Sequence, residues 1–511
     1  MALFGKGISR ICAVAAAPTA AEMARQVRQA LRETPTVELR LDWLRNDAER
    51  LRFLAWLKKN RARNITFLAT CRRRLGGGRF PGNIRAQLHW LGRAREAGCS
   101  WCDLEVETLR EIPDGSLQGY AIPRRMLLSI HDFKRTPPLN PILNRYLSGA
   151  AELIKIAATA GSIADGVRLL AAAKRSKKVV AVSMGEAGLP ARILALRSGS
   201  ALTYAPVAEA TAPGQVSLWD MKHLYRAHRL TRRTAVYGVI GNPIGHSLSP
   251  LMHNKGFSAR RIDAVYLPFL VNDLHDFLKA VPELGVRGFS VTLPHKQGIL
   301  KFLKECEQLA ESIGAVNTVM VRPDGSLYGC NTDYVGVLRA LEKKLHLPCS
   351  RVLIFGAGGS ARAAAFALAR AGAAVAICAR REKPAHELAL AVGGEVIPRR
   401  ALRGEFFDAI LNATPVGMHP HERISPLEPR ELNCRIVMDL IYRPQRTELL
   451  KRAAQKGIIT VSGVDMFLAQ GIAQWEMWTA KRAPETVMRR AVKSALNAES
   501  ESGNNKPGRL P

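Results

Sequence analysis

The chain has 511 residues, of which 47% are hydrophobic and 23% charged, so its composition is that of a globular protein and its length predicts about three domains. It contains no run of about 18 apolar residues, which excludes a membrane-spanning helix. The net charge of +32 could indicate a nucleic-acid-binding protein, but the basic residues are spread out, and the densest cluster, Arg72–Arg74, lacks interleaved aromatic residues. We therefore expect a basic surface that attracts small anions, with neither nucleic acid nor membrane as partner.

The cysteines and the start of the chain bear on the compartment. Nine cysteines are scattered along the sequence; Cys99 and Cys102 have the spacing of metal ligands, but no second pair stands in register with them. We predict free thiols in a reducing compartment, the cytoplasm, and no metal site. Basic residues before ICAVAAAPTA (11–20) faintly resemble a secretory signal, but the alanine-rich centre is weakly apolar and fits a first buried strand better.

Short apolar segments alternate with helical stretches through the first half of the chain. The predicted strands are Ile11–Ala15, Val37–Leu41, Ile65–Cys71, Trp101–Val106, Met126–Ile130, Leu153–Ala157, Val179–Ser183 and Leu202–Pro206. Segments of helical composition lie between them, such as Ala20–Glu33 and Ile163–Lys174. Eight strands alternating with helices predict a closed parallel (β/α)8 barrel, in which chemistry gathers at the carboxyl ends of the strands.

Two polar residues in these strands indicate a reaction. Lys155 is flanked by apolar residues in LIKIA (153–157), and an ammonium inside a buried strand is costly unless it has a task, such as Schiff-base formation with a ketone. His131 follows an apolar run in SIHDF and is suited to act as a base beside such a lysine. The alternatives are a lysine that snorkels at a strand end and a histidine that only caps a strand.

Charged residues also alternate along VELRLD (37–42). Glu38, Arg40 and Asp42 point to the same side of a strand, so inside a barrel they need a polar ligand or one another. Further polar groups at strand ends or in later loops are Arg72, Arg192 and Gln215.

In order, the motifs VELRLD, ATCR, SIHDF-x-x-TP, LIKIA, SMGE and APGQ resemble those of type I 3-dehydroquinate dehydratase over nearly all of the first half. The resemblance implies that Lys155 forms an imine with the C3 ketone of 3-dehydroquinate. It also implies that His131 removes a C2 proton and then helps the C1 hydroxyl to leave as water. The residues implied to hold the carboxylate and hydroxyls are Glu38, Arg40, Arg72, Arg192, Thr211 and Gln215.

The sequence departs from this family at one position. The family usually has a glutamate four residues after the arginine that matches Arg72, whereas this chain has Gly76. Because Lys155 and His131 remain, we expect the departure to affect the rate more than the type of reaction. A barrel that has lost activity and serves as a scaffold is the alternative.

The second half follows without a Gly/Ser linker, since residues 218–233 are predicted to form a basic last helix running directly into the next unit. Ser247 and Ser249 lie in a polar loop and suit a carboxylate or polyol, although turn serines often bond only their own backbone. Lys296 and Asp333 follow neighbouring strands, where they can form a pair that passes a proton to a carbonyl oxygen as hydride arrives. The alternative is a surface ion pair.

A dinucleotide site is predicted in RVLIFGAGGSARAA (351–364), where a buried strand, a glycine turn and a helix follow one another. The glycines let the backbone approach a pyrophosphate at the helix N-terminus. The residues predicted to hold the dinucleotide there are Gly356, Ala357, Gly358, Gly359, Ser360 and Ala361. After the next strand, Ala374–Cys378, the chain carries Arg380 and Arg381 instead of an acid, which favours the 2′-phosphate of NADP.

The second half resembles shikimate dehydrogenase from Val236 to about Ala491. The shared motifs are GNPIGHSLSPLMHN, VTLPHK, GAVNT, GCNTDYVG, GAGGSARA, NATPVGM, DLIYRPQRTELL and GVDMFLAQG. The resemblance implies a catalytic pair, Lys296 and Asp333, and a nicotinamide bordered by Thr414 and Met418. The substrate-binding residues that it implies are Ser247, Ser249, Thr292, Asn317 and Gln470. Ser290 stands where that family often has asparagine.

Together the two halves resemble the fused dehydroquinate dehydratase–shikimate dehydrogenases of the shikimate pathway, an α/β architecture in which the barrel is followed by a two-domain half with a Rossmann-type NADP domain. The expected small-molecule partners are 3-dehydroquinate, 3-dehydroshikimate and shikimate. The predicted parts are a barrel (1–230), a substrate-binding domain (236–340), an NADP domain (341–465), C-terminal helices that return to the substrate domain (466–495) and a disordered tail (496–511).

Overall fold

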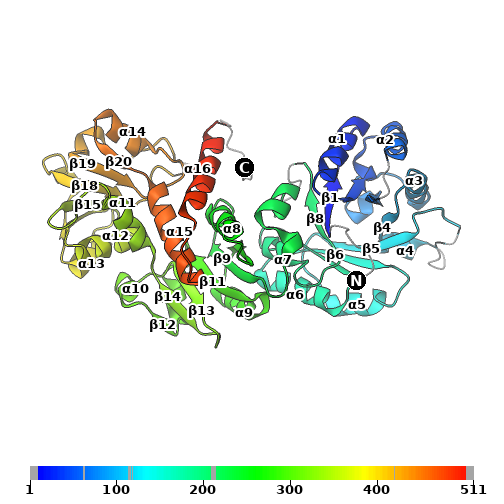
Figure 1. Cartoon of the computed structure of the whole chain (residues 1–511), viewed down its shortest axis with the longest axis horizontal. Coiled ribbons are helices and arrows are strands. Elements are labelled where there is room, and N and C mark those ends of the chain that lie inside the picture. Colours follow the sequence, from blue (N-terminus) through cyan, green and yellow to red (C-terminus); the bar gives the residue numbers. More distant parts are fainter. Residues whose placement is uncertain are drawn as a thin grey trace. The chain divides into compact units, whose positions relative to one another are not determined.

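The computed structural model describes residues 10–60, 64–112, 117, 119–208, 214–418 and 421–501. The chain divides into two compact units, Met1–Ala235 with Asp263–Leu284, and Val236–Ile262 with Gly285–Pro511 (Figure 1). Within the described residues, no helix is long and apolar enough to cross a membrane. The finer division into five parts stays a prediction. Thr211 and residues 502–511 of the predicted tail lie outside the described residues, whereas residues 496–501 of that tail form the end of a helix, Glu485–Glu501.

The first unit contains a sheet of eight parallel strands. They are β1 (Ile11–Ala15), β2 (Thr36–Arg40), β3 (Thr66–Thr70), β4 (Trp101–Glu105), β5 (Arg125–Asp132), β6 (Leu153–Thr159), β7 (Val179–Met184) and β8 (Thr203–Pro206). Their order is β7-β6-β5-β4-β3-β2-β1-β8, and Ala201 N–H donates to Val179 O where the two outer strands approach. All eight predicted strands are confirmed, with ends that differ by at most two residues.

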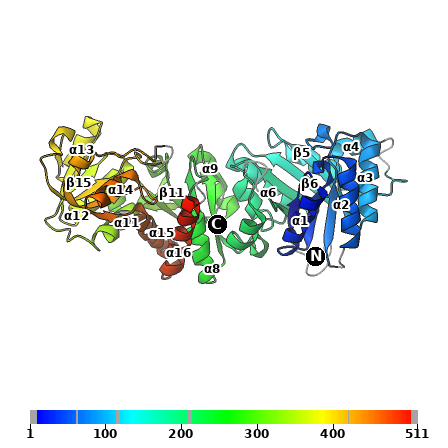
Figure 2. The same ribbon diagram turned by 90° about the horizontal axis from the view of Figure 1, so that it is seen from above.

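Helices follow these strands on the outside of the sheet (Figures 1 and 2). They are α1 (Ala20–Leu31), α2 (Asp47–Lys59), α3 (Ile84–Glu96), α4 (Val106–Glu111), α5 (Leu139–Tyr146), α6 (Ile163–Arg175) and α7 (Leu189–Leu194). Local sequence fixes several of their starts, because Thr19, Asn46 and Asn83 each accept a hydrogen bond from the backbone three residues on. Ser162 and Asp165 form a reciprocal capping box at α6.

The prediction of one basic helix over residues 218–233 is wrong. The segment forms a π-helical turn, Asp220–Leu224, and a 3₁₀ turn, Ala227–Arg229. Between them Arg226 adopts a left-handed backbone with φ 51°, which ends the first turn, and its guanidinium donates to Ala264 O.

A second, mixed sheet supports the loops that carry Ser247, Lys296 and Asn317. Its strands are β9 (Ala235–Gly241), β10 (Ala264–Leu270), β11 (Val286–Val291), β12 (Glu305–Cys306), β13 (Thr318–Val321) and β14 (Leu327–Cys330), in the order β10-β9-β11-β13-β14-β12. The accompanying helices are α8 (Ser249–Ala259), α9 (Leu274–Leu284), α10 (Gln308–Ile313) and α11 (Asp333–Leu341). In the second unit, α15 (Gly463–Thr479) packs against α11, and α16 (Glu485–Glu501) packs against α8.

The third sheet is parallel and has the order β17-β16-β15-β18-β19-β20. Its strands are β15 (Arg351–Phe355), β16 (Ala374–Cys378), β17 (Glu395–Val396), β18 (Phe407–Asn412), β19 (Cys434–Asp439) and β20 (Ile459–Val461). One core packs α12 (Gly359–Arg370) and α13 (Glu382–Val392) on one face, and a second core packs α14 (Glu448–Gln455) on the other. Strand order reverses beside β15, the position at which such sheets bind ligands.

Candidate active sites

A buried lysine lies inside the eight-stranded sheet. Lys155 of β6 is only 5% exposed, and its Nζ donates to Asp103 Oδ2 at 2.7 Å and lies 3.5 Å from Glu38 Oε1. The ammonium also stands over the ring of Tyr204, 4.4 Å from its centroid. Two carboxylates and an aromatic face therefore compensate the buried charge. The side chain does not reach solvent.

Asp103 of β4 joins this lysine to Arg72. Its carboxylate accepts from Ser129 Oγ at 2.5 Å, and both of its oxygens lie 3.3 Å from Arg72 Nη2. Burial by itself would raise the pKa of Asp103, but Lys155 and Arg72 together lower that pKa below its ordinary value. Asp103 is therefore an anion that stabilises the ammonium form of Lys155.

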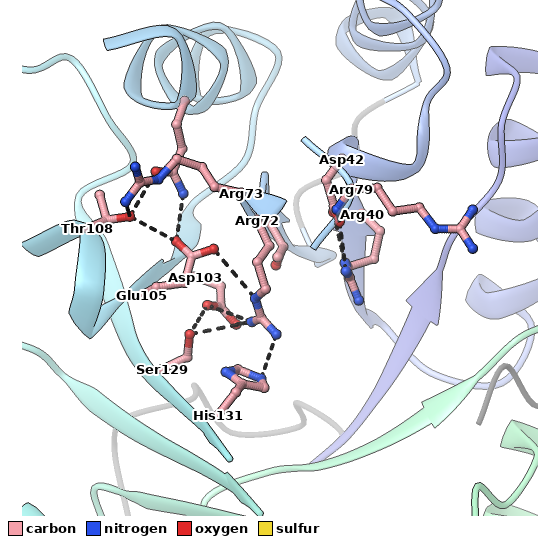
Figure 3. Close-up of polar contacts among 12 residues, drawn as sticks. Arg40, Asp42, Arg72, Arg73, Arg79, Asp103, Glu105, Thr108, Ser129 and His131 are labelled. Atoms are coloured by element: carbon pink, nitrogen blue, oxygen red, sulfur yellow. Dashed lines mark hydrogen bonds and ion pairs between the residues drawn. The ribbon is translucent and has the colours of Figure 1, made fainter. Parts of the chain in front are cut away.

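His131, near the end of β5, is held by the guanidinium of Arg72 (Figure 3). Arg72 Nη1 and His131 Nε2 are 2.6 Å apart, and because arginine can only donate, Nε2 accepts and the ring proton is on Nδ1. Burial, followed by the charges of Arg72 and Lys155, holds the pKa of His131 well below its ordinary value. His131 is thus a neutral imidazole, and its lone pair on Nε2 faces Arg72.

The other predicted barrel residues lie at the same end of the strands. Arg40 forms a two-pronged ion pair with Asp42, at 2.9 and 2.8 Å (Figure 3). Arg192 is buried, its Nε donates to Ser183 O, and burial lowers its pKa to about 10. In the described part of the chain, no carboxylate lies within ion-pair distance of Arg192, so its charge is open to an anionic ligand. Gln215 is half-buried after β8.

The sequence analysis missed three polar residues of this site, Asp103, Glu105 and Ser129. All three are buried inside strands, and Asp103 and Glu105 alternate in WCDLE as Glu38 and Arg40 do in VELRLD. The same period-two argument could therefore have found the two carboxylates. Ser129 carries no such signal, because a single serine in an apolar run is unremarkable.

In the second unit, Lys296 and Asp333 form an ion pair, with Nζ and Oδ2 2.5 Å apart. The prediction of neighbouring strands is wrong, because Lys296 follows β11 and Asp333 follows β14, and β13 lies between these two strands. Asn317 Nδ2 donates to the other oxygen, Oδ1, at 2.7 Å. The amide oxygen of Asn317 accepts from Thr318 Oγ1 and from the backbone of Thr332, both at 2.7 Å, so the orientation of this amide is fixed. The pair is partly buried, with Asp333 9% and Lys296 18% exposed at their side chains, and is not an ordinary surface ion pair.

The remaining predicted substrate residues lie on three segments of the second unit. Ser247 is half-buried and accepts from the N–H of buried Ser249, the first residue of α8. Thr292 is half-buried after β11, and Gln470 is buried in α15.

Sequence reasoning missed Gln474, one turn after Gln470 in α15. Its Oε1 accepts from Ser290 Oγ at 2.8 Å, and its Nε2 donates to Thr318 Oγ1 at 2.9 Å. Ser290, the departure from the related family, is thus tied to the segment that carries Asn317. The spacing of four residues between two glutamines on a helix was the available signal.

The turn after β15 has the properties of a dinucleotide cradle. Gly356 has φ +124°, and a Cβ there would stand 3.1 Å from Ala413 O, so the position requires glycine. Gly358 and Gly359 have open space where a Cβ would be, and no side chain caps the N-terminus of α12. Ala357 and Ser360 are half-buried and Ala361 buried in the same turn.

Two exposed arginines, Arg380 and Arg381, follow β16, next to this turn in the sheet. Thr414 lies against Gly356, because its Cγ2 is 3.2 Å from the position that a Cβ of this glycine would take. Met418 is 42% exposed in the same loop. The residues present therefore fit NADP, with phosphate groups at the glycine turn and at the two guanidiniums.

No group of three or more histidine, cysteine or carboxylate side chains within the described residues is placed to hold a metal ion. All nine cysteines are free thiols, and both Cys99 and Cys102 are buried.

Three parts of the chain match known families. Residues 11–231 match type I 3-dehydroquinase, residues 239–319 the shikimate dehydrogenase substrate-binding domain, and residues 463–493 the shikimate 5′-dehydrogenase C-terminal domain. A shikimate dehydrogenase (NADP(+)) of Methanothermobacter thermautotrophicus is 41% identical over 285 residues, which is 53% of this chain and 100% of the relative. A crystal structure of shikimate 5-dehydrogenase from Thermus thermophilus with NADP(H) and shikimate is 33% identical, covers 51% of this chain and 99% of its own, and has a TM-score of 0.48.

One relative spans both halves. It is the bifunctional 3-dehydroquinate dehydratase/shikimate dehydrogenase, chloroplastic, of Arabidopsis thaliana, which is 35% identical over 479 residues, covering 88% of this chain and 78% of the relative. A single alignment thus runs from the barrel through the dinucleotide domain. The chain belongs to the family of bifunctional 3-dehydroquinate dehydratase/shikimate dehydrogenases.

Proposed function

We propose that the chain converts 3-dehydroquinate to shikimate in two steps, a dehydration in the first unit and an NADPH-dependent reduction in the second. The observation that carries the proposal is that each unit places a shielded lysine against an aspartate, Lys155 with Asp103 and Lys296 with Asp333. The first lysine lies beside a neutral histidine, and the second lies in a unit that also has a dinucleotide cradle.

In the dehydration, the Lys155 ammonium, which donates to Asp103 at 2.7 Å, must first lose a proton. The freed amine attacks the C3 ketone, and loss of water gives an imine whose positive charge acidifies the C2 proton. His131 takes that proton and returns it to the C1 hydroxyl, which leaves as water. Hydrolysis of the imine releases 3-dehydroshikimate and restores Lys155.

The substrate is held by charged groups around this lysine. Arg192, which has no carboxylate partner among the described residues, binds the substrate carboxylate. Glu38 and Arg40 bind hydroxyls, and Arg72 places His131. Thr211 and Gln215 complete this proposed set from the loop after β8.

In the reduction, NADPH supplies a hydride when bound. The Lys296–Asp333 pair gives a proton to the carbonyl oxygen that becomes the new hydroxyl, and Asn317 fixes the aspartate for that transfer. Ser247 and Ser249 bind the substrate carboxylate, and Thr292 and Gln470 bind its hydroxyls. The cofactor is held by the turn from Gly356 to Ala361, by Arg380 and Arg381, and by Thr414 and Met418 at its nicotinamide end.

A coupled assay tests the proposal. Wild type given 3-dehydroquinate and NADPH is expected to consume NADPH, whereas Lys155→Ala is expected to do so only when given 3-dehydroshikimate. Lys177→Ala, which removes an exposed lysine after α6, is the matched control and should behave as wild type. A wild type that also requires 3-dehydroshikimate would show an inactive barrel, the alternative raised by Gly76.

We propose the cytoplasm as the compartment, which the nine free thiols support. The Arabidopsis relative is described as chloroplastic. Fractionation of the source cells, followed by the coupled assay on each fraction, decides between a cytosolic and an organellar location.

A further inference from the structure

We propose that Glu105 is a positioning residue of the dehydratase site, which holds Arg72 against His131 from the space beside Gly76. The inference rests on the proposed dehydration. It assigns a task to a buried carboxylate that the mechanism above does not use, and it explains how the site accommodates a glycine at position 76.

One oxygen of Glu105 is anchored by neutral groups (Figure 3). Glu105 ends β4 and is 2% exposed, and its Oε2 accepts from Gln87 Nε2 at 2.6 Å and from Thr108 Oγ1 at 3.4 Å. Thr108 is fixed in turn by Arg73, whose Nη2 donates to Thr108 Oγ1 at 3.1 Å. The carboxylate therefore cannot turn freely, and its second oxygen has a defined direction.

That second oxygen faces Arg72. Glu105 Oε1 lies 3.5 Å from Arg72 Nε, and both atoms are buried. Neither atom has a hydrogen-bond partner among the described residues, so each faces only the other. Removal of Glu105 would leave Arg72 with Asp103 as its carboxylate partner, whereas removal of Arg72 would leave the Glu105 carboxylate buried without an ion-pair partner.

Each of the three guanidinium nitrogens of Arg72 thus faces a different side chain. Glu105 faces Nε, Asp103 accepts from Nη2, and Nη1 donates to His131 Nε2. Without Glu105 the guanidinium would be held only through Nη2, by Asp103 and Ser129, and it would be free to turn about that nitrogen and leave His131. The effect of Glu105 on catalysis consequently passes through Arg72.

Gly76 lies directly beside Glu105. A Cβ built on Gly76 would lie 3.3 Å from Glu105 Cγ, 3.6 Å from Glu105 Oε1 and 3.6 Å from Arg72 Cγ. A side chain at position 76 would therefore start in contact with both Glu105 and Arg72. The glycine leaves this face of Arg72 to the carboxylate of β4.

Relocating the carboxylate tests this assignment. We would compare Glu105→Ala, Glu105→Gln and the double variant Gly76→Glu/Glu105→Ala, each assayed for dehydration and for the adduct that borohydride forms on Lys155 with 3-dehydroquinate. The single variants should dehydrate about 100-fold more slowly, the scale of a misplaced catalytic group, yet still form the adduct because the imine requires Lys155 and not His131. The double variant should recover most of the lost rate.

Glu107→Ala is the matched control, since Glu107 is an exposed carboxylate of α4, the helix that begins directly after Glu105. It should dehydrate as wild type does. Reduction of 3-dehydroshikimate by the second unit gives the concentration of intact chain, and Glu105→Gln, which keeps the shape of the side chain, covers a failure of the alanine variant to fold.

Single variants that dehydrate as fast as Glu107→Ala would overturn the inference, and so would a loss of adduct together with the loss of rate. A double variant that recovers nothing would also contradict it. If wild type itself neither dehydrates nor forms the adduct, the proposed function fails as well, and the two failures are thereby distinguished.

Discussion

Arg192 is a buried charge for which we propose an anionic ligand. Burial lowers the pKa of this guanidinium to about 10, and its Nε donates only to a backbone carbonyl, Ser183 O. A folded-state pKa below the unfolded value means that the folded state binds the proton less well, so below about pH 10 the charged group lowers the free energy of unfolding. The barrel tolerates this cost, and an anionic substrate would relieve it.

We therefore expect Arg192→Met to raise the thermal midpoint of the barrel while it weakens substrate binding. The rise in thermal midpoint corresponds to an increase in the free energy of unfolding on the order of 3 kcal/mol at neutral pH. The KM for 3-dehydroquinate should rise at least about 10-fold. Calorimetry and steady-state kinetics measure the two effects. Arg145→Met, at an exposed position of α5, should change neither. A lower midpoint together with an unchanged KM would contradict this account.

We propose that the second reaction depends on Asp333. In Asp333→Asn, one amide must meet both the Lys296 ammonium and the Asn317 amide nitrogen, which lie at 2.5 and 2.7 Å from the present carboxylate. The rate of 3-dehydroshikimate reduction should fall about 10²- to 10⁴-fold, whereas dehydration should not change. Asp324→Asn removes an exposed carboxylate paired with Lys304 and serves as the control. Equal rates in the two variants would exclude Asp333 from proton transfer.

Residue-level prediction from sequence succeeded where a charge interrupts an apolar strand. Glu38 and Lys155 were predicted from that anomaly, and the structure places them 3.5 Å apart. The contact between Arg72 and His131 could not be predicted, because the two residues are separated by 59 positions and meet only through the register of β3, β4 and β5. Charged residues also interrupt the apolar strand WCDLE (101–105), and Asp103 and Glu105 could have been predicted from it in the same way.

At the scale of elements, Asp439 ties together two loops of the dinucleotide domain. Its buried carboxylate at the end of β19 accepts from Asn412 Nδ2 and Ile441 N at 3.0 Å and from Thr447 Oγ1 at 2.6 Å. Burial raises the pKa of Asp439 to about 6. Because the folded state then binds the proton more tightly than the unfolded chain, stability is lost as pH rises from about 4 to 6, by on the order of 3 kcal/mol.

Asp439→Asn should remove this dependence. An asparagine can keep the three contacts if the Thr447 hydroxyl accepts where it now donates. The difference in thermal midpoint between variant and wild type should therefore grow in favour of the variant between pH 4.5 and 7. Asp465→Asn, at a half-exposed aspartate of α15, should follow wild type. Parallel curves for Asp439→Asn and wild type would refute the assignment.

Elements were predictable where the local sequence alone determines them. The eight strands of the first unit are apolar runs bounded by charged or turn residues, and their predicted ends were correct to within two residues. The stretch 218–233 was not, because the left-handed backbone of Arg226 (φ 51°) has no local signature such as glycine or asparagine.

At the scale of the whole molecule, the charge of +32 should govern the capture of substrate. All three expected ligands are carboxylates, and a strongly positive surface raises their encounter rate. We expect kcat/KM of both reactions to fall by up to about 10-fold as ionic strength rises from 0.01 to 0.5 M, as screening shortens from about 30 Å to a few Å. Sucrose at matched viscosity is the control. A kcat/KM that does not respond to salt would contradict a role of the surface charge in substrate capture.

The same charge could keep 3-dehydroshikimate near the chain that made it. A mixture of Lys155→Ala and Asp333→Asn tests this, because each variant lacks one reaction and the intermediate must pass between molecules. Wild type should then release a smaller transient of free 3-dehydroshikimate than the mixture at equal activity. Transients of equal size would rule retention out.

The connection between the two units has a consequence for supply. Only Leu230–Thr234 separates the last 3₁₀ turn of the barrel from β9, so both catalytic sites come from one translated chain. Their numbers in the cell are equal whatever the level of expression, and gene control cannot favour one reaction over the other. The ratio between formation and consumption of 3-dehydroshikimate is therefore set by the rate constants of the two sites. A change in the dehydratase rate, such as one caused by the glycine at position 76, changes the rate of the whole two-step conversion.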